Sequence, residues 1–171
     1  MFDIFGEFNS AQEINQAAAG LLAEGDEKNI YVLAKENGLD EAFAQAYIEG
    51  EIPELTNALM AAVGKIELER SGISDPFFGD MKDDMINYLL SQCQNDDFAN
   101  EVRKKGKSLK KCFEQCKKEI EKALSRKNGA LRDRVVYAME KDYYFMKEVS
   151  KGEKEATREV ADETDSANEE K

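Results

Sequence analysis

The sequence predicts an all-α fold. Apolar residues recur at intervals of three and four along nearly the whole chain, helix start and stop signals separate the apolar stretches, and no segment shows the sustained alternation of a β-strand. We divide the chain into an acidic helical subdomain over residues 1–72, a helical subdomain with a basic helix over residues 79–149, and an acidic tail over residues 150–171. The tail is too poor in large apolar side chains to offset the entropy of ordering it, so we expect it to be disordered.

Four short helices are predicted in the first subdomain. Each of the first three follows a capping residue and ends near a glycine. The capping residues are Ser10, Asp26 and Asp40, and the glycines are Gly25, Gly38 and Gly50. Ser10 also forms a capping box with Glu13. Pro53 is well placed to open the fourth helix. The apolar stripe of that helix comprises Leu55, Leu59, Val63 and Ile66.

The second subdomain begins after a break. Ser, Gly and Pro punctuate residues 71–80, which favours a turn there. A helix carrying Met81 to Leu89 and a short helix around Phe98 and Val102 follow. A long helix is predicted from an apolar seam of Leu109, Phe113, Cys116, Ile120 and Leu124. Asn128 and Gly129 are expected to end it. The inward positions of the last helix are Leu131, Val135, Met139, Tyr143 and Met146.

The composition narrows the classes of function. The 171 residues are 42% hydrophobic and 35% charged, with a formal net charge of −12, which is typical of a soluble acidic protein. No stretch approaches the roughly 20 apolar residues of a membrane span, and Asp3 and Glu7 argue against a signal peptide, so we expect a cytoplasmic protein. The absence of His removes His-based acid/base catalysis and His-ligated zinc. We therefore expect a non-enzymatic protein that needs no cofactor.

The three cysteines predict no disulfide framework and no metal site. Cys112 and Cys116 lie four apart on one helical face, and Cys93 adds one more thiolate at most. Because a structural zinc needs four ligands, buried thiols are the favoured interpretation.

Two further patterns resemble binding motifs without their decisive residues. The string Gly106–Ser108 resembles the end of a phosphate-binding P-loop, but Glu101 stands where the first glycine is required. Residues 33–48 have the spacing of a helix-turn-helix, but the second helix offers no Lys or Arg to DNA. We therefore interpret these helices as scaffold.

Charge is distributed unevenly along the chain. Residues 1–100 hold 20 acidic and 5 basic residues, whereas residues 101–147 hold 7 acidic and 15 basic ones. Either the two surfaces face each other in the fold or they bind different partners. The acidic candidates for partner binding are Asp40, Glu41, Glu49, Glu51, Glu54, Asp80, Asp83 and Asp84. The basic candidates, expected on the outer face of the long helix, are Arg103, Lys104, Lys105, Lys107, Lys110, Lys111, Lys117 and Lys118. A solvated amphipathic helix is the alternative interpretation of this basic face.

Two stretches resemble known proteins. Residues 104–145, with their GKSL, CF and NGA segments and an aromatic last helix, resemble the PcfK-like family, small helical proteins of conjugative plasmids and other mobile elements of Firmicutes. The last helix lacks the Trp and His expected of that family. Residues 1–69 are similar to proteins encoded by phages and integrative elements of gut Clostridia.

These resemblances imply a function. Both groups include anti-CRISPR proteins that inhibit the type II RNA-guided DNA endonuclease. The implied protein binds this endonuclease, with or without guide RNA, in the bacterial host cell and blocks target-DNA cleavage stoichiometrically. Its acidic residues would imitate DNA phosphates in one version, and its helices would brace the enzyme against domain movement in the other.

Other functions remain open at this stage. A nucleic-acid-binding accessory protein of conjugation or phage replication would act through the basic helix. A helical adaptor for another protein of the mobile element is a third interpretation. The sequence leaves the oligomeric state open. A homodimer would use aromatic residues if they are exposed, whereas core packing is the commoner place for such residues; they are Phe77, Phe78, Tyr143 and Tyr144.

Overall fold

The computed structural model of the protein describes residues 4–126 and 131–146, and in these ranges it contains eight α-helices and no β-strand. The predicted all-α fold is therefore confirmed. The helices are α1 (Ala11–Ala23), α2 (Glu27–Glu36), α3 (Glu41–Ile48), α4 (Ala58–Arg70), α5 (Met81–Gln92), α6 (Asp96–Arg103), α7 (Leu109–Arg126) and α8 (Asp133–Phe145). The expected helix end at Asn128 and Gly129 and the expected tail over residues 150–171 lie outside the described residues.

The first three helices begin and end as predicted. Ser10, Asp26 and Asp40 each accept a hydrogen bond from a backbone N–H in the first turn that follows, at 3.2, 3.2 and 2.8 Å. The side chain of Glu13 completes the cap of α1 by accepting from the Asn9 N–H at 2.7 Å. The residues after these helices adopt a left-handed backbone, and they are Gly25, Gly38 and Gly50. Local capping chemistry thus sets the limits of α1 to α3.

The prediction that Pro53 opens the fourth helix is wrong. Helix α4 begins at Ala58, because Asn57 caps it by accepting from the Met60 N–H at 2.9 Å. Before it, the side-chain amide of Asn15 donates to the Thr56 carbonyl at 2.9 Å and accepts from the Thr56 N–H at 3.0 Å. These two hydrogen bonds use the backbone groups of Thr56 that a longer helix would need, so the segment before α4 stays non-helical.

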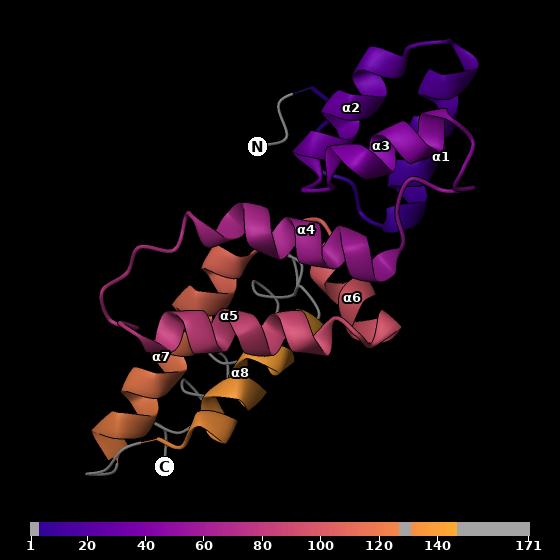
Figure 1. Ribbon diagram of the computed structural model, residues 1–171. Helices are drawn as coiled ribbons and strands as arrows, with labels where there is room; N and C mark the ends of the chain where they lie inside the picture. The colour runs from indigo at the N-terminus through magenta and orange to yellow at the C-terminus, as the bar shows by residue number, and fades with distance from the viewer. Residues whose placement is uncertain (1–3, 127–130, 147–171) are drawn as a thin grey trace, which may run out of the picture.

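The helices form two hydrophobic clusters that share α4. Helices α1 to α3 pack at one end of the molecule, α5 to α8 form the other end, and α4 lies between them (Figure 1). In α4, Ala61 packs in the N-terminal cluster, whereas Ala62 and Ile66 pack in the C-terminal cluster. Helix α4 contributes to both clusters, and the division into subdomains after residue 72 stays a prediction.

The C-terminal cluster departs from the predicted stripes at its far end. The seam of α7 is buried from Leu109 to Ile120, but the Leu124 side chain is 40% exposed. The inward face of α8 is shifted from the predicted one. Its fully buried residues are Val136, Glu140 and Tyr144, whereas Leu131, Met139 and Tyr143 of the predicted stripe are partly buried against the cluster. A carboxyl in the middle of this face breaks the apolar pattern, which is why periodicity missed it.

The aromatic residues considered for a homodimer are divided between core and surface. Phe78 and Tyr144 are buried, as the core-packing alternative expects, whereas Phe77 is exposed and Tyr143 is half-buried. Phe78 packs edge-on against Phe113 with ring centroids 4.7 Å apart, and Tyr144 packs against Phe98 at 5.5 Å. Core packing accounts for this pair.

The end of α2 meets α4 backbone to backbone through two glycines. A Cβ added at Gly64 would lie 2.3 Å from the Asn37 carbonyl oxygen, and one added at Gly38 would lie 2.4 Å from the Gly64 carbonyl oxygen. Gly38 also has a φ of +70°, which side chains rarely adopt. No other residue type fits this crossing without displacing one helix.

We expect Gly64→Ala to lower the free energy of unfolding by about 3 kcal/mol, because the new methyl group would overlap backbone atoms that cannot rotate away. The matched control is Gly20→Ala within α1, where a Cβ would meet no atom within 4 Å. The control should be neutral or up to about 1 kcal/mol more stable. Urea unfolding of both variants measures the difference, and equal stabilities would contradict the close crossing.

Candidate functional site

Two of the eight basic candidates are buried, so their predicted place on an exposed face is wrong. Arg103 is the last residue of α6 and is 1% exposed, and its guanidinium donates to the side-chain oxygen of Asn37 after α2. Burial lowers the pKa of Arg103 to about 10, against the attraction of Glu7 and Glu69. Arg103 therefore joins α6 to the end of α2 and is not available to a partner.

Lys107 has a structural role at the end of α8. Its ammonium donates to the carbonyl oxygens of Tyr143 and Met146 and lies 5.0 Å from the centre of the Tyr143 ring. These carbonyls belong to the last turn of α8 and the residue after it, where a cation is favourable. The GKS string therefore supplies a cap for α8, in keeping with its rejection as a nucleotide site.

A third buried cation, Lys65, was not singled out in the sequence. Lys65 is 1% exposed, and its ammonium donates to the Glu7 carboxylate at 2.7 Å and to the Lys104 carbonyl oxygen at 3.1 Å. Burial lowers its pKa, and Glu7 opposes that shift. A signal was available, since Lys65 stands between Gly64 and Ile66 in the stripe that α4 buries.

Two of the three buried cations, Lys65 and Arg103, form one group with the acids around them, which we name the ionic junction. Its members are Glu7, Lys65, Glu69 and Arg103. Burial raises the pKa of Glu69, whose carboxylate accepts from the Leu109 N–H at the start of α7. The junction thus ties the N-terminal segment, α4, α6 and α7 together.

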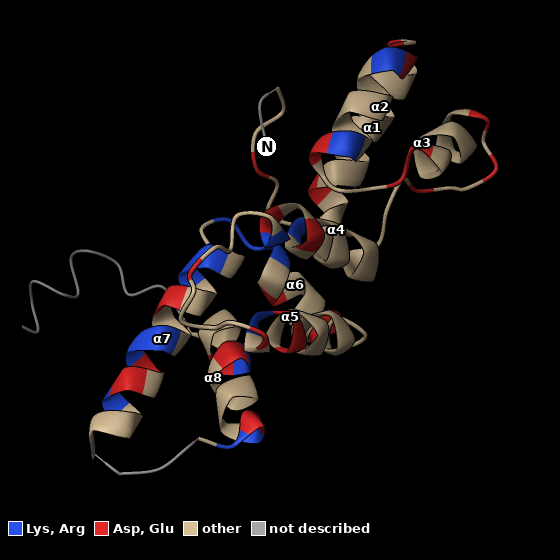
Figure 2. Ribbon diagram, turned by 60° about the vertical axis from the view of Figure 1, so that its left-hand side comes forward, with Lys and Arg blue, Asp and Glu red and all other residues tan. Residues whose placement is uncertain are grey.

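The exposed face of α7 is of mixed charge. The exposed charged residues of this helix are Lys110, Lys111, Glu114, Lys118, Glu121 and Lys122. Basic and acidic residues accordingly alternate along α7 (Figure 2). Lys117 pairs with Asp75 at 2.7 Å and lies 5.1 Å from the centre of the Phe77 ring, and Lys104 pairs with Glu101. Lys105 is exposed. The basic face is therefore weaker than the residue count suggests.

Five acidic candidates remain exposed around α3, and we name them the acidic ridge. They are Asp40, Glu41, Glu49, Glu51 and Glu54. The 29 residues from 36 to 64 contain six acidic residues and no Lys or Arg. Among the described residues, no ion pair involves a member of the ridge. The ridge is therefore not neutralised by ion pairs of the described residues, although the exposed Lys35 lines the same pocket as Glu41.

The other three acidic candidates lie elsewhere. Asp80, Asp83 and Asp84 are exposed at the start of α5, in the C-terminal cluster. Asp83 pairs with Arg70 at 2.8 Å. The structure therefore does not join them to the acidic ridge, and the two groups are separate surfaces.

Glu140 is a buried carboxyl within the C-terminal cluster. Neither of its oxygens has a hydrogen-bond partner among the described residues. Burial raises its pKa to about 9, and the neighbouring Cys116 contributes in the same direction. Glu140 is therefore protonated at neutral pH, which makes its burial less unfavourable than burial of an unpaired charge.

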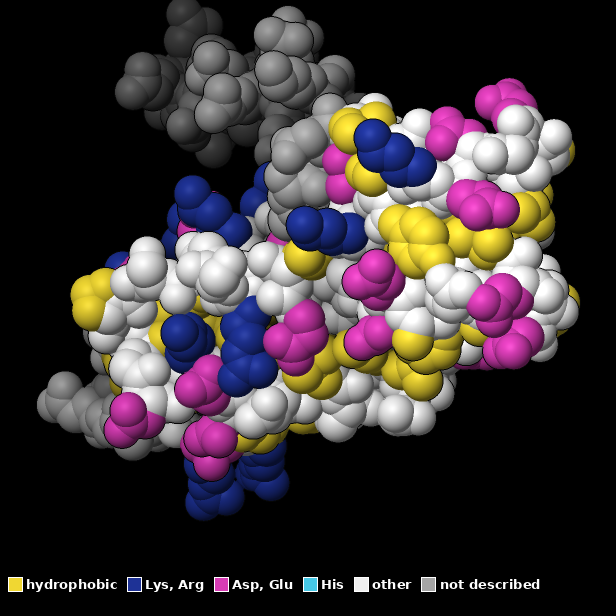
Figure 3. All heavy atoms as spheres, turned by 45° about the horizontal axis from the view of Figure 1, so that its top comes forward, with side chains coloured by type: hydrophobic (Ala, Val, Ile, Leu, Met, Phe, Trp, Pro, Cys, Tyr) yellow, Lys and Arg dark blue, Asp and Glu magenta, His cyan; other side chains and the backbone are white. Residues whose placement is uncertain are grey.

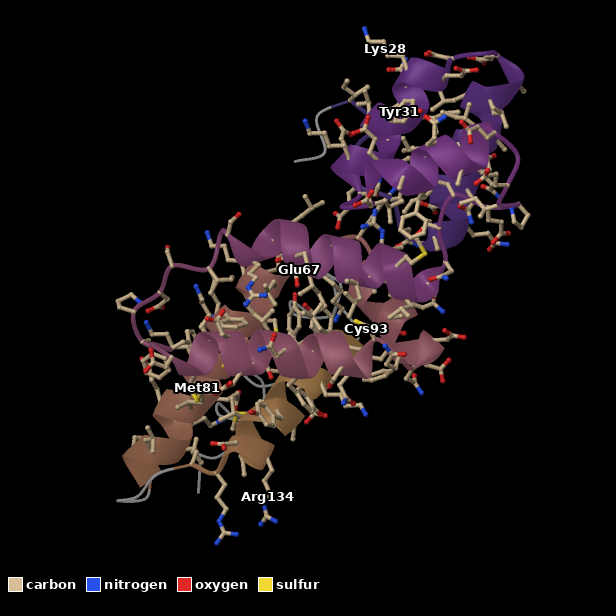
Figure 4. All side chains as sticks on the ribbon, in the orientation of Figure 1. Lys28, Tyr31, Glu67, Met81, Cys93 and Arg134 are labelled. Carbon is tan, nitrogen blue, oxygen red and sulfur yellow. The ribbon has the colours of Figure 1, made fainter. Side chains whose placement is uncertain are left out.

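The three cysteines are free and buried, as predicted. Cys93 lies among the helices of the C-terminal cluster (Figure 4), and burial raises the pKa of its thiol to about 12. In the described part of the chain, no three Cys, Asp or Glu side chains are grouped so as to hold a metal ion. None of the described helices has the length and apolar character needed to cross a membrane.

Comparison with protein-family models finds no match, and comparisons with curated proteins and with solved structures find no significant similarity. The family resemblance of the sequence therefore stays a prediction, and the acidic ridge and the mixed face of α7 are the surfaces on which a function must be argued.

We expect Lys65→Ala to lower the free energy of unfolding by about 3 kcal/mol, because Glu7 and the Lys104 carbonyl would lose their buried donor. Lys28→Ala on α2 is the control, since the Lys28 side chain is exposed and points away from the molecule (Figure 4). Denaturant unfolding compares the two variants. A loss no greater than that of the control would show that the junction is open in solution.

We expect the stability conferred by neutral Glu140 to be complete below its ordinary pKa of 4.5 and to be lost as the pH rises toward about 9. Relative to Glu140→Met, the wild type should therefore lose about 1.4 kcal/mol per pH unit between pH 5 and 8. Unfolding at several pH values tests this, with the exposed Glu121→Met as control. A pH-independent difference for Glu140→Met would contradict the raised pKa.

Proposed function

We propose that this chain is a non-enzymatic anti-CRISPR protein that binds the type II RNA-guided DNA endonuclease and blocks target cleavage, with the acidic ridge as part of its contact surface. The acidic ridge carries the proposal, because its exposed carboxylates have no cation beside them within residues 36–64. The resemblances of residues 1–69 and 104–145 to proteins of mobile elements support the choice of partner.

Electrostatics explains why such a surface suits this partner. The endonuclease holds its guide–target heteroduplex in a positively charged channel. An anionic protein is attracted to a channel of that kind over a distance of about a Debye length, which speeds association at low salt. In this proposal inhibition is stoichiometric binding, either in the place of DNA or as a brace that prevents the cleavage-competent arrangement.

A second candidate function is nucleic-acid binding as an accessory protein of conjugation or phage replication. The exposed lysines around the start of α7 favour it, namely Lys104, Lys105, Lys110 and Lys111. The burial of Arg103 and Lys107 and the exposed Glu114 and Glu121 reduce the positive charge available to phosphates. Gel shifts from low to physiological salt, with these four lysines changed to Ala, test this candidate, and no complex at any salt would exclude it.

We expect reversal of Glu49, Glu51 and Glu54 to Lys to weaken binding of the guide-loaded endonuclease by at least tenfold, because three attractive contacts would become repulsive. The control reverses Glu24, Glu114 and Glu121, which are exposed outside the ridge and give the same change in net charge. Calorimetric titration measures affinity for both triple variants.

A target-cleavage assay with increasing amounts of the protein completes the test. Loss of cleavage near equimolar protein is the expected result, and parallel gel shifts of target DNA distinguish the DNA mimic from the brace. Full cleavage at large excess with several endonuclease orthologues would refute the proposal. Equal affinities of the two triple variants would show that the acidic ridge is not part of the contact surface.

A further inference from the structure

One member of the acidic ridge, Glu54, lines an apolar groove, and Glu51 precedes the lining residues Ile52 and Pro53 in the chain. The groove has a volume of about 230 Å³ and lies between α3 and the segment that leads into α4. Its apolar lining residues are Phe43, Ile52, Pro53, Leu55 and Met60. Phe43 is 41% exposed, although it lies on the same short helix as the buried Ala44 and Tyr47. On the face shown in Figure 3, hydrophobic and acidic side chains gather together over the N-terminal helices.

The walls of the groove are held in place by the fold. The backbone N–H groups of Glu51 and Ile52 both donate to the Ala46 carbonyl, which ties the loop back to α3. On the other side, the Asn15 side chain holds Thr56 by two hydrogen bonds, and Leu55 is fully buried. A groove that is formed before binding loses little entropy when a partner occupies it.

We infer that this groove docks a basic amphipathic helix of a protein partner, with an apolar side chain inserted beside Phe43 and with Lys or Arg side chains opposite Glu49, Glu51 and Glu54. The inference rests on the proposed function when that partner is taken to be the endonuclease. The groove itself is an observation independent of any partner.

Size and charge together identify the occupant. The groove is smaller than the roughly 300–1,000 Å³ of sites that enclose a small molecule, and it suits a single anchoring side chain. The Glu54 carboxylate in its lining, and the absence of any Lys or Arg there, disfavour phosphates, which argues against nucleic acid. A basic amphipathic helix matches both features, because it places apolar side chains at positions i, i+3, i+4 and i+7 and Lys or Arg side chains beside them.

The test uses the full chain and a fluorescent synthetic helix of Leu and Lys with leucines at those positions. Fluorescence polarisation should show binding, and amide shifts in NMR spectra should concentrate on residues 43–60. Phe43→Ala should weaken binding by about tenfold, as expected for a central aromatic contact. The control is Phe77→Ala, because Phe77 is 37% exposed but lies far along the chain, before α5. A peptide of the same composition in scrambled order should bind more weakly than the amphipathic one.

The same variants are then titrated with the guide-loaded endonuclease. Loss of affinity for both peptide and enzyme in Phe43→Ala supports the groove as the docking site. Peptide binding without any enzyme binding by the wild type supports the groove and refutes the proposed function. Enzyme binding that Phe43→Ala leaves unchanged refutes the groove while the proposed function stands.

Two further outcomes overturn the inference. The first is equal binding of the amphipathic and scrambled peptides, or no binding of either. The second is a wild-type dimer in sedimentation equilibrium that Phe43→Ala converts to a monomer, because the occupant would then be a second copy of this chain.

Discussion

The close approach of the turn after α2 to helix α4 is the constraint on which the rest of the structure depends. Gly38 and Gly64 let the backbone after α2 approach the backbone of α4. The Asn37 side chain beside them accepts a hydrogen bond from the guanidinium of Arg103 in α6. The hydrogen bond between Arg103 and Asn37 holds the end of α6 beside this close contact. The contact and the hydrogen bond together join the N-terminal cluster to the C-terminal cluster.

The ionic junction adds specificity to this contact. Removing a cation from water is unfavourable unless acceptors replace the water, and Lys65 and Arg103 find theirs only when α4, α6 and the N-terminal segment are all in place. An alternative packing of the two clusters would leave these charges buried without acceptors. The junction thus selects one arrangement of apolar faces that would otherwise tolerate several.

The parts of this structure that follow local rules could be predicted from the sequence, and the parts that follow from burial of charge could not. Caps such as Ser10 and terminators such as Gly38 act within one helical turn, so a few neighbouring residues are enough to predict their effect. Lys65 and Arg103 look like surface residues in any short window, because their acceptors come from segments 39 or more residues away. Glu140 misled the prediction of α8 because a carboxyl group interrupts the apolar pattern of the face that the helix buries. The acidic candidate residues around α3 are exposed, as expected. Two of the basic candidates, Arg103 and Lys107, are buried and do not lie on an exposed basic face.

The acidic ridge is significant because of how acidic and basic side chains are divided between the interior and the surface. The buried cations donate their hydrogen bonds to acceptors within the fold. Lys65 donates to Glu7, and Lys107 donates to a carbonyl oxygen at the end of α8. Four of the nine exposed lysines in the described part of the chain lie on α7, at the opposite end of the molecule from α3 (Figures 1 and 2). Only Lys28 and Lys35 on α2 are exposed cations of the N-terminal helices, so the acidic residues there outnumber the basic ones. Close carboxylates repel one another, so this excess lowers stability unless a positively charged surface approaches. A positively charged surface that approached the ridge would reduce this repulsion, which is why the proposed function places the partner there.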